Sequence, residues 1–409
     1  MKIIYLHQYF NTPQMSGGTR SYEMAKRLVA AGHEVHMITS WVQETNHLDW
    51  FNEEIDGIKV HWFPNPYSNK MSYKQRIQAF LRFAYASMQK ITTIPADIVF
   101  ATSTPLTIAI PGVLGARKQK IPMIFEVRDL WPEVPIAMGI LKKPYQIFLA
   151  KKLEKWAYKN SAHIVALSPG MKEGVIATGY PENQVSIIPN SCDNDLFEVQ
   201  SNDFEIFKSR NTWLPEGDLI IYTGTFGIVN DVGIAVDLAK ELKNRQSNIS
   251  ILLIGDGLEF DKVYKRAIDE DVLNQTLYIR KQVPKTEIPY FLKYAAMASS
   301  FAINIPAIQA NSANKFFDAL AASKPILINY GGWQKDIIEN NQCGLVAWGK
   351  SIKETIDDVE NFLNNKEKYN QACRNAKSLA LNDFSRDMLA KKLEAILIEG
   401  ARKQGKFND

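Results

Sequence analysis

Cysteine is scarce in this chain of 409 residues. The three cysteines, Cys192, Cys343 and Cys373, are few and far apart. Such a set forms neither a disulfide framework nor a zinc site with paired ligands, so we expect a protein of the reducing cytoplasm. No apolar run reaches about 18 residues, and Met1-Lys2 leads straight into an apolar segment typical of a strand. We therefore expect a protein that is neither exported nor membrane-spanning.

Net charge is also small, at +4, but it is unevenly distributed. Residues 1–188 carry 21 Lys and Arg against 14 Asp and Glu, whereas the rest of the chain carries 27 against 30. Within residues 59–159 there are 16 basic and 5 acidic side chains. A field of this sign orients a protein towards an anionic surface, either lipid headgroups or nucleic acid.

Short apolar runs alternate with helical patterns along the whole chain, which predicts repeated β-α-β units and parallel sheets covered on both faces. The length favours two domains. The strands predicted in the first half are Lys2–Leu6, Glu34–Thr39, Ile58–Trp62, Asp97–Ala101, Pro122–Glu126, His163–Ala166 and Val185–Ile188. Those predicted in the second half are Leu219–Thr223, Ser250–Ile254, Thr276–Ile279, Ser299–Asn304, Pro325–Asn329 and Gly344–Trp348.

A polar, turn-rich segment at 189–197 separates the two series of alternating strands and helices. We place the hinge there. The predicted domains are a Rossmann-like domain at 1–188, joined by a C-terminal helix at about 386–403 that packs back on it, and a second Rossmann-like domain at 189–385. The predicted fold class is α/β, with two facing Rossmann-like domains and a cleft between them.

The segment 311–325 is the most informative, because small polar residues lead into an amphipathic helix followed by an apolar strand. Free N–H groups at a helix start bind phosphate, and Lys315 in the first turn adds a cation. Asp318, one turn later, can accept hydrogen bonds from ribose hydroxyls. The alternative is an ordinary polar N-cap, which explains Ser312 but not Lys315. We assign Ser312, Ala313, Asn314, Lys315 and Asp318 to this anion site.

Ligands of open parallel sheets bind beyond the carboxyl ends of the strands, so the loops there are further candidates. Gly17 and Gly18 let the backbone approach a phosphate, which Arg20 can neutralise. A turn without a ligand is the alternative. Weaker candidates are Gly224, Thr225, Phe226 and Gly255, together with Arg280 and Lys281. None completes a dinucleotide fingerprint.

A crowded polar loop follows the fifth predicted strand. It contains Glu126, Arg128, Asp129, Trp131 and Glu133. Carboxylates accept hydrogen bonds from sugar hydroxyls and an indole stacks on a sugar ring, so we assign these residues to a polar ligand. The alternative is a structural ion pair between Arg128 and a carboxylate.

Two weaker patterns carry less weight. Asp193-Asn194-Asp195 resembles a manganese signature, but capping and turn roles at the hinge suffice, so no metal is assigned. His7 is left unassigned, because no nucleophilic set assembles around it.

Two basic stretches, 70–90 and 142–159, mix lysines and arginines with aromatic residues, which suits an anionic membrane surface. Solvated helix faces are the alternative there. No nucleic-acid partner is expected, because no binding motif accompanies the charge.

Taken together, these loops resemble glycosyltransferase family 4, also called group 1, which has the GT-B fold. Gly17-Gly18 and the helix leading to Gly32 resemble the opening of the family, Val185–Phe197 its interdomain segment, and Asp318–Pro325 its "E-A-M-A-x-G-x-P" motif. Glu126–Glu133 and Ser312–Ala322 resemble more closely bacterial surface-polysaccharide enzymes that transfer L-fucosamine (FucNAc).

The chain departs from the family pattern at two places. The acidic pair of the family falls on Ala310 and Asp318, so the first carboxylate is missing. The Arg and Lys of the family fall near Thr225–Asp231, where neither is present, so we expect Lys315, with Arg20, to neutralise the diphosphate.

The resemblance implies a retaining hexosyltransferase that moves an amino-deoxy sugar from a UDP-sugar to a polyprenyl-diphosphate-linked glycan in O-antigen or capsule synthesis. It would act in the cytoplasm on the inner face of the plasma membrane. Lys315 and Asp318 would be catalytic, Asp129 would orient the acceptor, and no cofactor or metal is expected. A sugar-nucleotide epimerase and a non-catalytic nucleotide-sugar-binding scaffold remain as alternatives.

Overall fold

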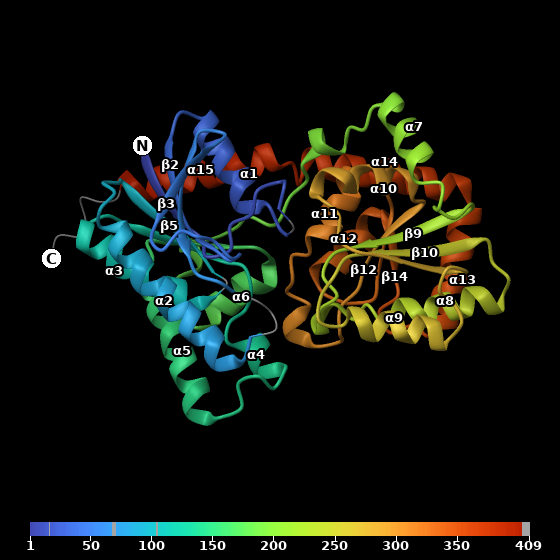
Figure 1. The fold of residues 1–409 in the computed structure, drawn as a ribbon, viewed down its shortest axis with the longest axis horizontal. Coiled ribbons are helices and arrows are strands. Elements are labelled where there is room, and N and C mark those ends of the chain that lie inside the picture. The colour runs from blue at the N-terminus through green and yellow to red at the C-terminus, as the bar shows by residue number, and fades with distance from the viewer. Residues whose placement is uncertain (16, 68–70, 104, 403–409) are drawn as a thin grey trace. The chain divides into compact units, whose positions relative to one another are not determined.

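The computed structural model describes residues 1–15, 17–67, 71–103 and 105–402. The chain divides into two compact units (Figure 1). Unit 1 comprises residues 1–12, 19–189 and 387–409, and unit 2 comprises residues 13–18 and 190–386. The change between units along the chain thus falls at Pro189, within the polar segment that interrupts the β-α rhythm. None of the helices in the described residues is long and apolar enough to cross a membrane.

Unit 1 is built on one sheet with the strand order β3-β4-β2-β1-β5-β6-β7-β8. Its strands are β1 (Lys2–Leu6), β2 (Glu34–Trp41), β3 (Phe51–Ile55), β4 (Ile58–Pro64), β5 (Ile98–Thr102), β6 (Met123–Val127), β7 (His163–Ala166) and β8 (Val185–Ile187). All neighbours pair in parallel except β3 and β4, which form an antiparallel hairpin. Every residue of β5 and β6 is buried, as expected for strands covered on both faces.

Helices cover both faces of this sheet (Figure 1). They are α1 (Arg20–Ala30), α2 (Tyr73–Ile91), α3 (Ala109–Gln119), α4 (Glu133–Ala137), α5 (Pro144–Lys159), α6 (Pro169–Ala177) and α15 (Arg386–Arg402), with 3-10 turns η1 (Leu106–Ile108) and η2 (Glu182–Gln184). Ser72 starts α2 with a capping box to Gln75. Helix α15 lies against unit 1, where Glu394 bonds His33 and Gly400 fits closely against Ile124.

Unit 2 has a six-stranded, fully parallel sheet with the order β11-β10-β9-β12-β13-β14. Its strands are β9 (Asp218–Thr223), β10 (Ile249–Ile254), β11 (Leu277–Arg280), β12 (Met297–Ser300), β13 (Ile326–Ile328) and β14 (Gly344–Val346). The order reverses between β9 and β12, which is the topological switch point of a Rossmann sheet. In open parallel sheets, ligands bind beyond the carboxyl ends of the strands at such a point.

The helices of unit 2 lie on both sides of the sheet (Figure 1). They are α7 (Ser201–Arg210), α8 (Ile234–Asn244), α9 (Phe260–Asp269), α10 (Ile288–Tyr294), α11 (Asn314–Ala321), α12 (Trp333–Asn341), α13 (Ile352–Asn364) and α14 (Lys366–Asn382). The 3-10 turns are η3 (Asn194–Phe197), η4 (Ile228–Asn230), η5 (Lys285–Glu287) and η6 (Pro306–Ile308). Tyr222, Phe226 and Phe301 are among the largest side chains of its core.

The prediction of a two-domain α/β protein with mainly parallel sheets is confirmed. Several elements differ from the prediction. Strand β3 and helices α4 and α7 were not predicted, and β12 lies at 297–300 rather than 299–304. Strand β3 lacks the apolar pattern by which the other strands were predicted. Its residues Asn52, Glu53 and Glu54 are exposed at the edge of the sheet, where polar residues are tolerated.

Candidate functional site

The start of helix α11 is the best anion-binding feature of unit 2. The helix follows β12, one of the two strands at the switch point, and its N-cap residue Ala313 makes no side-chain capping bond. Phe316 donates its N–H to the Ala313 carbonyl at 3.1 Å. Within the described part of the chain, the N–H groups of Asn314 and Lys315 have no such acceptor. Two donors at the positive end of the helix dipole are therefore available to an anion.

Ser312 has a different role from the one predicted. Its hydroxyl accepts the backbone N–H of Asn190 at 3.1 Å, and its carbonyl accepts the Asn190 side-chain amide at 2.5 Å. Ser312 and Ala313 are both buried. These bonds fix the backbone just before α11, so Ser312 positions the helix start and does not face a ligand. Asn190 could not be identified from sequence, because the contact joins residues 122 positions apart.

Lys315 lies on the first turn of α11 and is partly buried. Its Nζ is 4.9 Å from the centre of the Tyr222 ring, and a Cβ added at Gly224 would lie 2.5 Å from its Cε. Burial lowers the pKa of Lys315 to about 8, against an opposing effect of the nearby Asp318 carboxylate. The ammonium is thus poorly solvated, and a phosphate beside it would replace the water it has lost.

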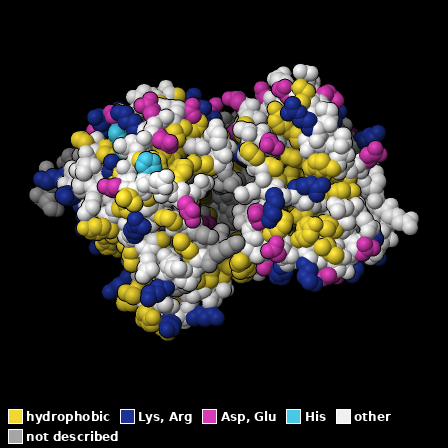
Figure 2. Space-filling view, viewed as in Figure 1, with side chains coloured by type: hydrophobic (Ala, Val, Ile, Leu, Met, Phe, Trp, Pro, Cys, Tyr) yellow, Lys and Arg dark blue, Asp and Glu magenta, His cyan; other side chains and the backbone are white. Residues whose placement is uncertain are grey.

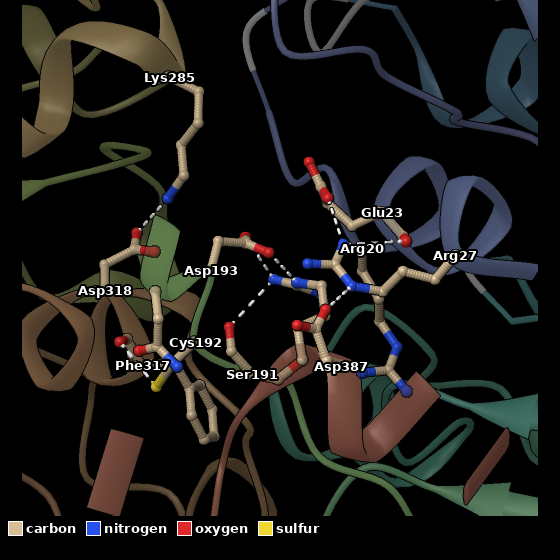
Figure 3. A network of polar contacts seen from close by, with 12 residues as sticks. Arg20, Glu23, Arg27, Ser191, Cys192, Asp193, Lys285, Phe317, Asp318 and Asp387 are labelled. Carbon is tan, nitrogen blue, oxygen red and sulfur yellow. Dashed lines mark hydrogen bonds and ion pairs between the residues drawn. The ribbon is translucent and has the colours of Figure 1, made fainter. Parts of the chain in front are cut away.

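Asp318 lies one turn further along α11 and is paired with Lys285. Lys285 Nζ is 2.5 Å from Asp318 Oδ2, and both side chains are mostly buried (Figure 3). Lys285 comes from η5, which follows β11. The prediction missed Lys285. Its place after a strand at the carboxyl edge of the sheet was the available signal, but nothing in the sequence pairs it with Asp318.

The glycine loops after β9 and β10 bind each other rather than exposing backbone donors. The N–H groups of Gly224, Phe226 and Gly255 donate to the carbonyls of Ile254, Asp256 and Arg280, at 2.9, 2.9 and 3.0 Å. A Cβ at Gly255 would lie 1.8 Å from the Gly224 carbonyl oxygen. These N–H groups therefore add no support to the weak assignment of Gly224, Phe226 and Gly255 to the donor site, and glycine is required at Gly255 because the two loops touch.

The remaining side chains assigned to this edge have local partners. The Arg280 guanidinium lies 4.0 Å from the centre of the Trp213 ring. Lys281 is exposed, bonds Asp256 at 3.2 Å and lies 3.4 Å from the centre of the Phe260 ring. The carbonyl of Thr225 accepts the Tyr222 hydroxyl at 2.8 Å. None of these contacts brings Arg280 or Lys281 to the start of α11.

In unit 1, Arg20 and Glu126 form a fully buried ion pair. Arg20 Nε and Nη2 donate to Glu126 Oε1 at 3.0 and 2.8 Å, and the guanidinium also donates to the carbonyls of Ile188 and Pro189. Thr102 donates to the other carboxylate oxygen at 2.6 Å. Burial alone would raise the pKa of Glu126, but the charge and hydrogen bonds of Arg20 hold it below its ordinary value.

This pair corrects two predictions. Arg20 was expected to neutralise a phosphate and Glu126 to bind an acceptor, yet neither side chain has any exposed surface. A structural ion pair was the alternative considered for this loop, with Arg128 as the cation. The cation is Arg20 instead, because α1 brings it to the end of β6.

Arg128 belongs to a polar cluster at the switch point of unit 1, between β1 and β5. Its Nη1 lies 3.0 Å from His7 Nε2, and its backbone N–H donates to Ser103 Oγ at 2.9 Å. His7 Nδ1 lies 2.7 Å from Ser21 Oγ. Burial and the Arg128 charge lower the pKa of His7, so the ring is neutral and accepts from Arg128. His7 thus holds Arg128 in place.

The other loop residues differ in accessibility. Asp129 is exposed, and Trp131 and Glu133 are partly buried. Oε2 of Glu133 is buried and has no hydrogen-bond partner among the residues that the structure describes. Burial, and to a smaller extent the charge of Glu133, raises the pKa of the neighbouring Glu154 to about 8. Of the predicted acceptor residues, Asp129 is the most open to a ligand.

Gly17 and Gly18, near the start of the chain, were assigned to the donor site. Gly17 has φ of 131°, which favours glycine. Ser16, in the same predicted loop, lies outside the described residues. Gly17 and Gly18 fall in the short segment 13–18 that is grouped with unit 2. Among the described residues, no three His, Cys, Asp or Glu side chains gather in a way that would hold a metal ion.

Two Rossmann-like α/β units, each with a mainly parallel sheet, are the architecture of the GT-B class of fold. Comparison with known protein families finds a match for each half of the chain. Residues 17–191 match the glycosyl transferase 4-like domain, and residues 203–379 match the glycosyl transferases group 1 domain. The chain thus contains a glycosyl transferase 4-like domain and a glycosyl transferases group 1 domain, and it is a glycosyltransferase. The prediction of these two kinds of domain is confirmed.

Solved structures share the fold over almost the whole chain. Anabaena HepE in complex with UDP-glucose has a TM-score of 0.72 at 14% identity, covering 98% of this chain and 100% of HepE. WaaG, a glycosyltransferase involved in lipopolysaccharide biosynthesis, has a TM-score of 0.70 at 15% identity, covering 97% and 99%. Sucrose-phosphate synthase from Thermosynechococcus elongatus has a TM-score of 0.74 at 13% identity, covering 97% and 98%. No curated protein sequence matches the chain.

Proposed function

We propose that this glycosyltransferase uses a UDP-sugar and holds the diphosphate of the donor at the start of α11. The observation that carries the proposal is Lys315, a poorly solvated ammonium beside two free N–H donors at the positive end of a helix. HepE, which has a similar fold, was crystallised with UDP-glucose, and this supports a uridine nucleotide.

The same groups would stabilise the leaving diphosphate. Charge that develops on UDP as the sugar departs would be met by the Asn314 and Lys315 N–H groups, the dipole of α11 and the Lys315 ammonium, all fixed before reaction. Asp318, oriented by Lys285, would accept from the ribose hydroxyls. The resemblance to family 4 implies retention of anomeric configuration.

The acceptor would bind unit 1 through the loop that follows β6. Asp129 is exposed there and is proposed to orient an acceptor hydroxyl, with Arg128 and Trp131 alongside. Arg128 is held by His7 and Ser103, so its guanidinium is placed without the help of a ligand. Residues 1–189 with α15 would serve the acceptor and residues 190–386 the donor.

We propose that the acceptor is a polyprenyl-diphosphate-linked glycan and that unit 1 works on the inner face of the plasma membrane. Tyr145, Phe148 and Leu149 on α5 are 58%, 58% and 59% exposed. Helix α2 exposes Ile77, Leu81 and Tyr85 at spacings of four residues. Figure 2 shows hydrophobic and basic side chains mixed over the lower end of this unit. Apolar and basic groups on the same helix suit the boundary of an anionic bilayer.

We propose an amino-deoxy sugar, L-FucNAc, as the transferred group in O-antigen or capsule synthesis. The support is the resemblance of Glu126–Glu133 and Ser312–Ala322 to L-fucosamine transferases. WaaG, of similar fold, is involved in lipopolysaccharide biosynthesis.

The experiment is incubation of the purified protein with a panel of UDP-sugars, including UDP-L-FucNAc, with and without lipid-linked acceptor. Release of UDP that requires acceptor supports transfer. An altered sugar without release indicates an epimerase, and binding without any reaction indicates a scaffold. Either result would refute the proposal.

Flotation with liposomes tests the membrane surface separately. Replacing Phe148 and Leu149 by Ser should abolish flotation with anionic vesicles at low salt, while Lys353→Gln in unit 2 should leave it unchanged. Absence of flotation by the wild-type protein would remove the membrane from the proposal but not the UDP-sugar reaction.

A further inference from the structure

One cavity of unit 2 lies at the C-terminal end of α11. It has a volume of about 470 Å³ and is bounded by η3, α10, the C-terminal end of α11, and α14. A volume of this size falls within the range of small-ligand pockets. Its lining is unusual in charge, since it contains Lys293, Lys324 and Lys377 but only one carboxylate, that of Glu198.

The three lysines are not neutralised within the described residues. Lys293 donates to the Val199 carbonyl at 2.7 Å, which is a neutral acceptor. No ion pair joins Lys324 or Lys377 to a described acidic residue, and Glu198 is exposed. Burial lowers the pKa of Lys324, a nearby Cys373 opposes this, and the charge of Lys293 lowers it further. Three basic side chains therefore line the cavity against the single carboxylate of Glu198.

Neutralising the helix end is the obvious structural role for such lysines, but α11 does not need them. Three of the last four carbonyls of α11 accept backbone N–H groups: Ala322 donates to Asp318, Ser323 to Leu320 and Lys324 to Ala319, at 3.0, 2.9 and 2.9 Å. Ser323 has φ of 55°, the left-handed conformation that closes a helix in this way. The helix is capped by its own backbone, so the lysine side chains remain available.

We propose that this cavity binds a small phosphate-bearing anion at a site separate from the start of α11. The charge and the volume fit a diphosphate or an organic phosphate. Lys324 and Lys293 would bind the phosphate oxygens, and Lys377 would cover the opening.

Binding there would influence the start of α11. The eight residues of α11 span about 12 Å, so one short helix joins the cavity to Lys315 and Asp318. An anion that shifts or stiffens the C-terminal end of α11 changes the position or the mobility of its N-terminal end. Any such coupling is reciprocal, so a nucleotide at Lys315 would alter the affinity of the cavity by the same factor.

The test is calorimetric titration of the full-length protein with inorganic pyrophosphate. Lys324→Gln is expected to raise the Kd of one binding event at least tenfold, and Lys293→Gln to raise it similarly. The matched control is Lys353→Gln, an exposed lysine of α13 outside the cavity, which should change nothing. Circular dichroism and thermal unfolding verify that each variant is folded.

Lys315→Ala separates this site from the start of α11. If the cavity binds pyrophosphate, a binding event that is sensitive to Lys324→Gln persists in Lys315→Ala. If every binding event is lost in Lys315→Ala, or if Lys324→Gln binds like the wild type, the proposal is wrong. Proton uptake on binding at alkaline pH, measured in two buffers with different ionisation heats, is expected in the wild type and reduced in Lys324→Gln.

Discussion

The Lys285 ammonium lies 2.5 Å from the Asp318 carboxylate and joins the loop after β11 to the second turn of α11. Lys285 also lies 5.4 Å from the centre of the Phe197 ring, so its side chain is held from two sides. This contact fixes the direction in which Asp318 presents its remaining oxygen lone pairs. It also makes Lys285 part of the proposed donor site without requiring that it touch the donor.

Replacing Lys285 by Met should therefore weaken UDP binding. We expect Kd to rise about tenfold, the effect of about 1.4 kcal/mol, because Asp318 loses the partner that orients it. The control is Lys240→Met, which breaks an ion pair of equal length to Glu270 at an exposed position and should leave Kd within about twofold. Calorimetry provides the measurement. Unchanged UDP affinity in Lys285→Met would show that Asp318 is not positioned by Lys285.

UDP affinity should depend on pH through Lys315. Its pKa of about 8 in the free protein means that the ammonium deprotonates as pH rises above 8, and only the ammonium attracts diphosphate. From pH 8 to 9 we expect Kd to rise about fivefold. Lys315→Gln should bind UDP more weakly at pH 7.5 and should lose this pH dependence. Comparing the two proteins also corrects for titration of the nucleotide itself. A wild-type profile that matches Lys315→Gln would remove Lys315 from the site.

The same pKa predicts a stability change of known sign. Between pH 8 and 10.5 the unfolded chain holds a proton on Lys315 that the folded chain has lost. The free energy of unfolding contributed by this residue therefore rises with pH across that window. Urea unfolding of wild type and Lys315→Gln at pH 8 and 9.5 measures the difference.

Removing Arg20 should destabilise unit 1 strongly. Arg20→Met leaves the buried Glu126 carboxylate without its cation, and we expect a loss of about 3–5 kcal/mol. The double variant Arg20→Met with Glu126→Leu should recover much of that loss, because no buried charge remains. Arg27→Met, which breaks the more exposed contacts of Arg27 with Glu23 and Asp387 (Figure 3), should cost about 1 kcal/mol or less. Urea unfolding gives all three values.

A functional readout distinguishes the two roles considered for Arg20. If the pair is structural, folded Arg20→Met at low temperature binds UDP as tightly as the wild type. A large loss of UDP affinity in protein that is still folded would return Arg20 to the donor site.

Glu154→Gln should stabilise the protein at high pH. Burial and the charge of Glu133 raise the pKa of Glu154 to about 8, so the folded chain holds a proton that the unfolded chain releases above about pH 4.5. Wild-type stability therefore falls as pH rises from 4.5 to 8, whereas a glutamine cannot ionise. We expect equal Tm at pH 5 and a gain of about 2–4 °C for the variant at pH 8.5. Glu173→Gln, at an exposed position, is the control, and an equal gain there would contradict the assignment.

The rhythm of short apolar runs and amphipathic helices was sufficient to predict two Rossmann-like domains. Strands such as β5 and β6 are apolar throughout because helices cover both of their faces, and this shows directly in their residues. The hairpin of β3 and β4 left a weaker signal, the Asp56-Gly57 turn between them, where both residues have positive φ. That turn was overlooked because the strand before it is mostly polar.

The start of α11 was also predictable, since a helix end and a first-turn lysine are local in sequence. The contacts between residues far apart in the sequence were not predictable. Arg20 meets Glu126 across 106 residues, Asn190 meets Ser312 across 122, and Lys285 meets Asp318 across 33. Residue types and spacing identify groups able to form such contacts, but they do not select among the many possible partners. Which groups are buried together follows from strand order and helix packing, so only the tertiary structure decided that Arg20 stabilises the fold while Lys315 remains available to an anion.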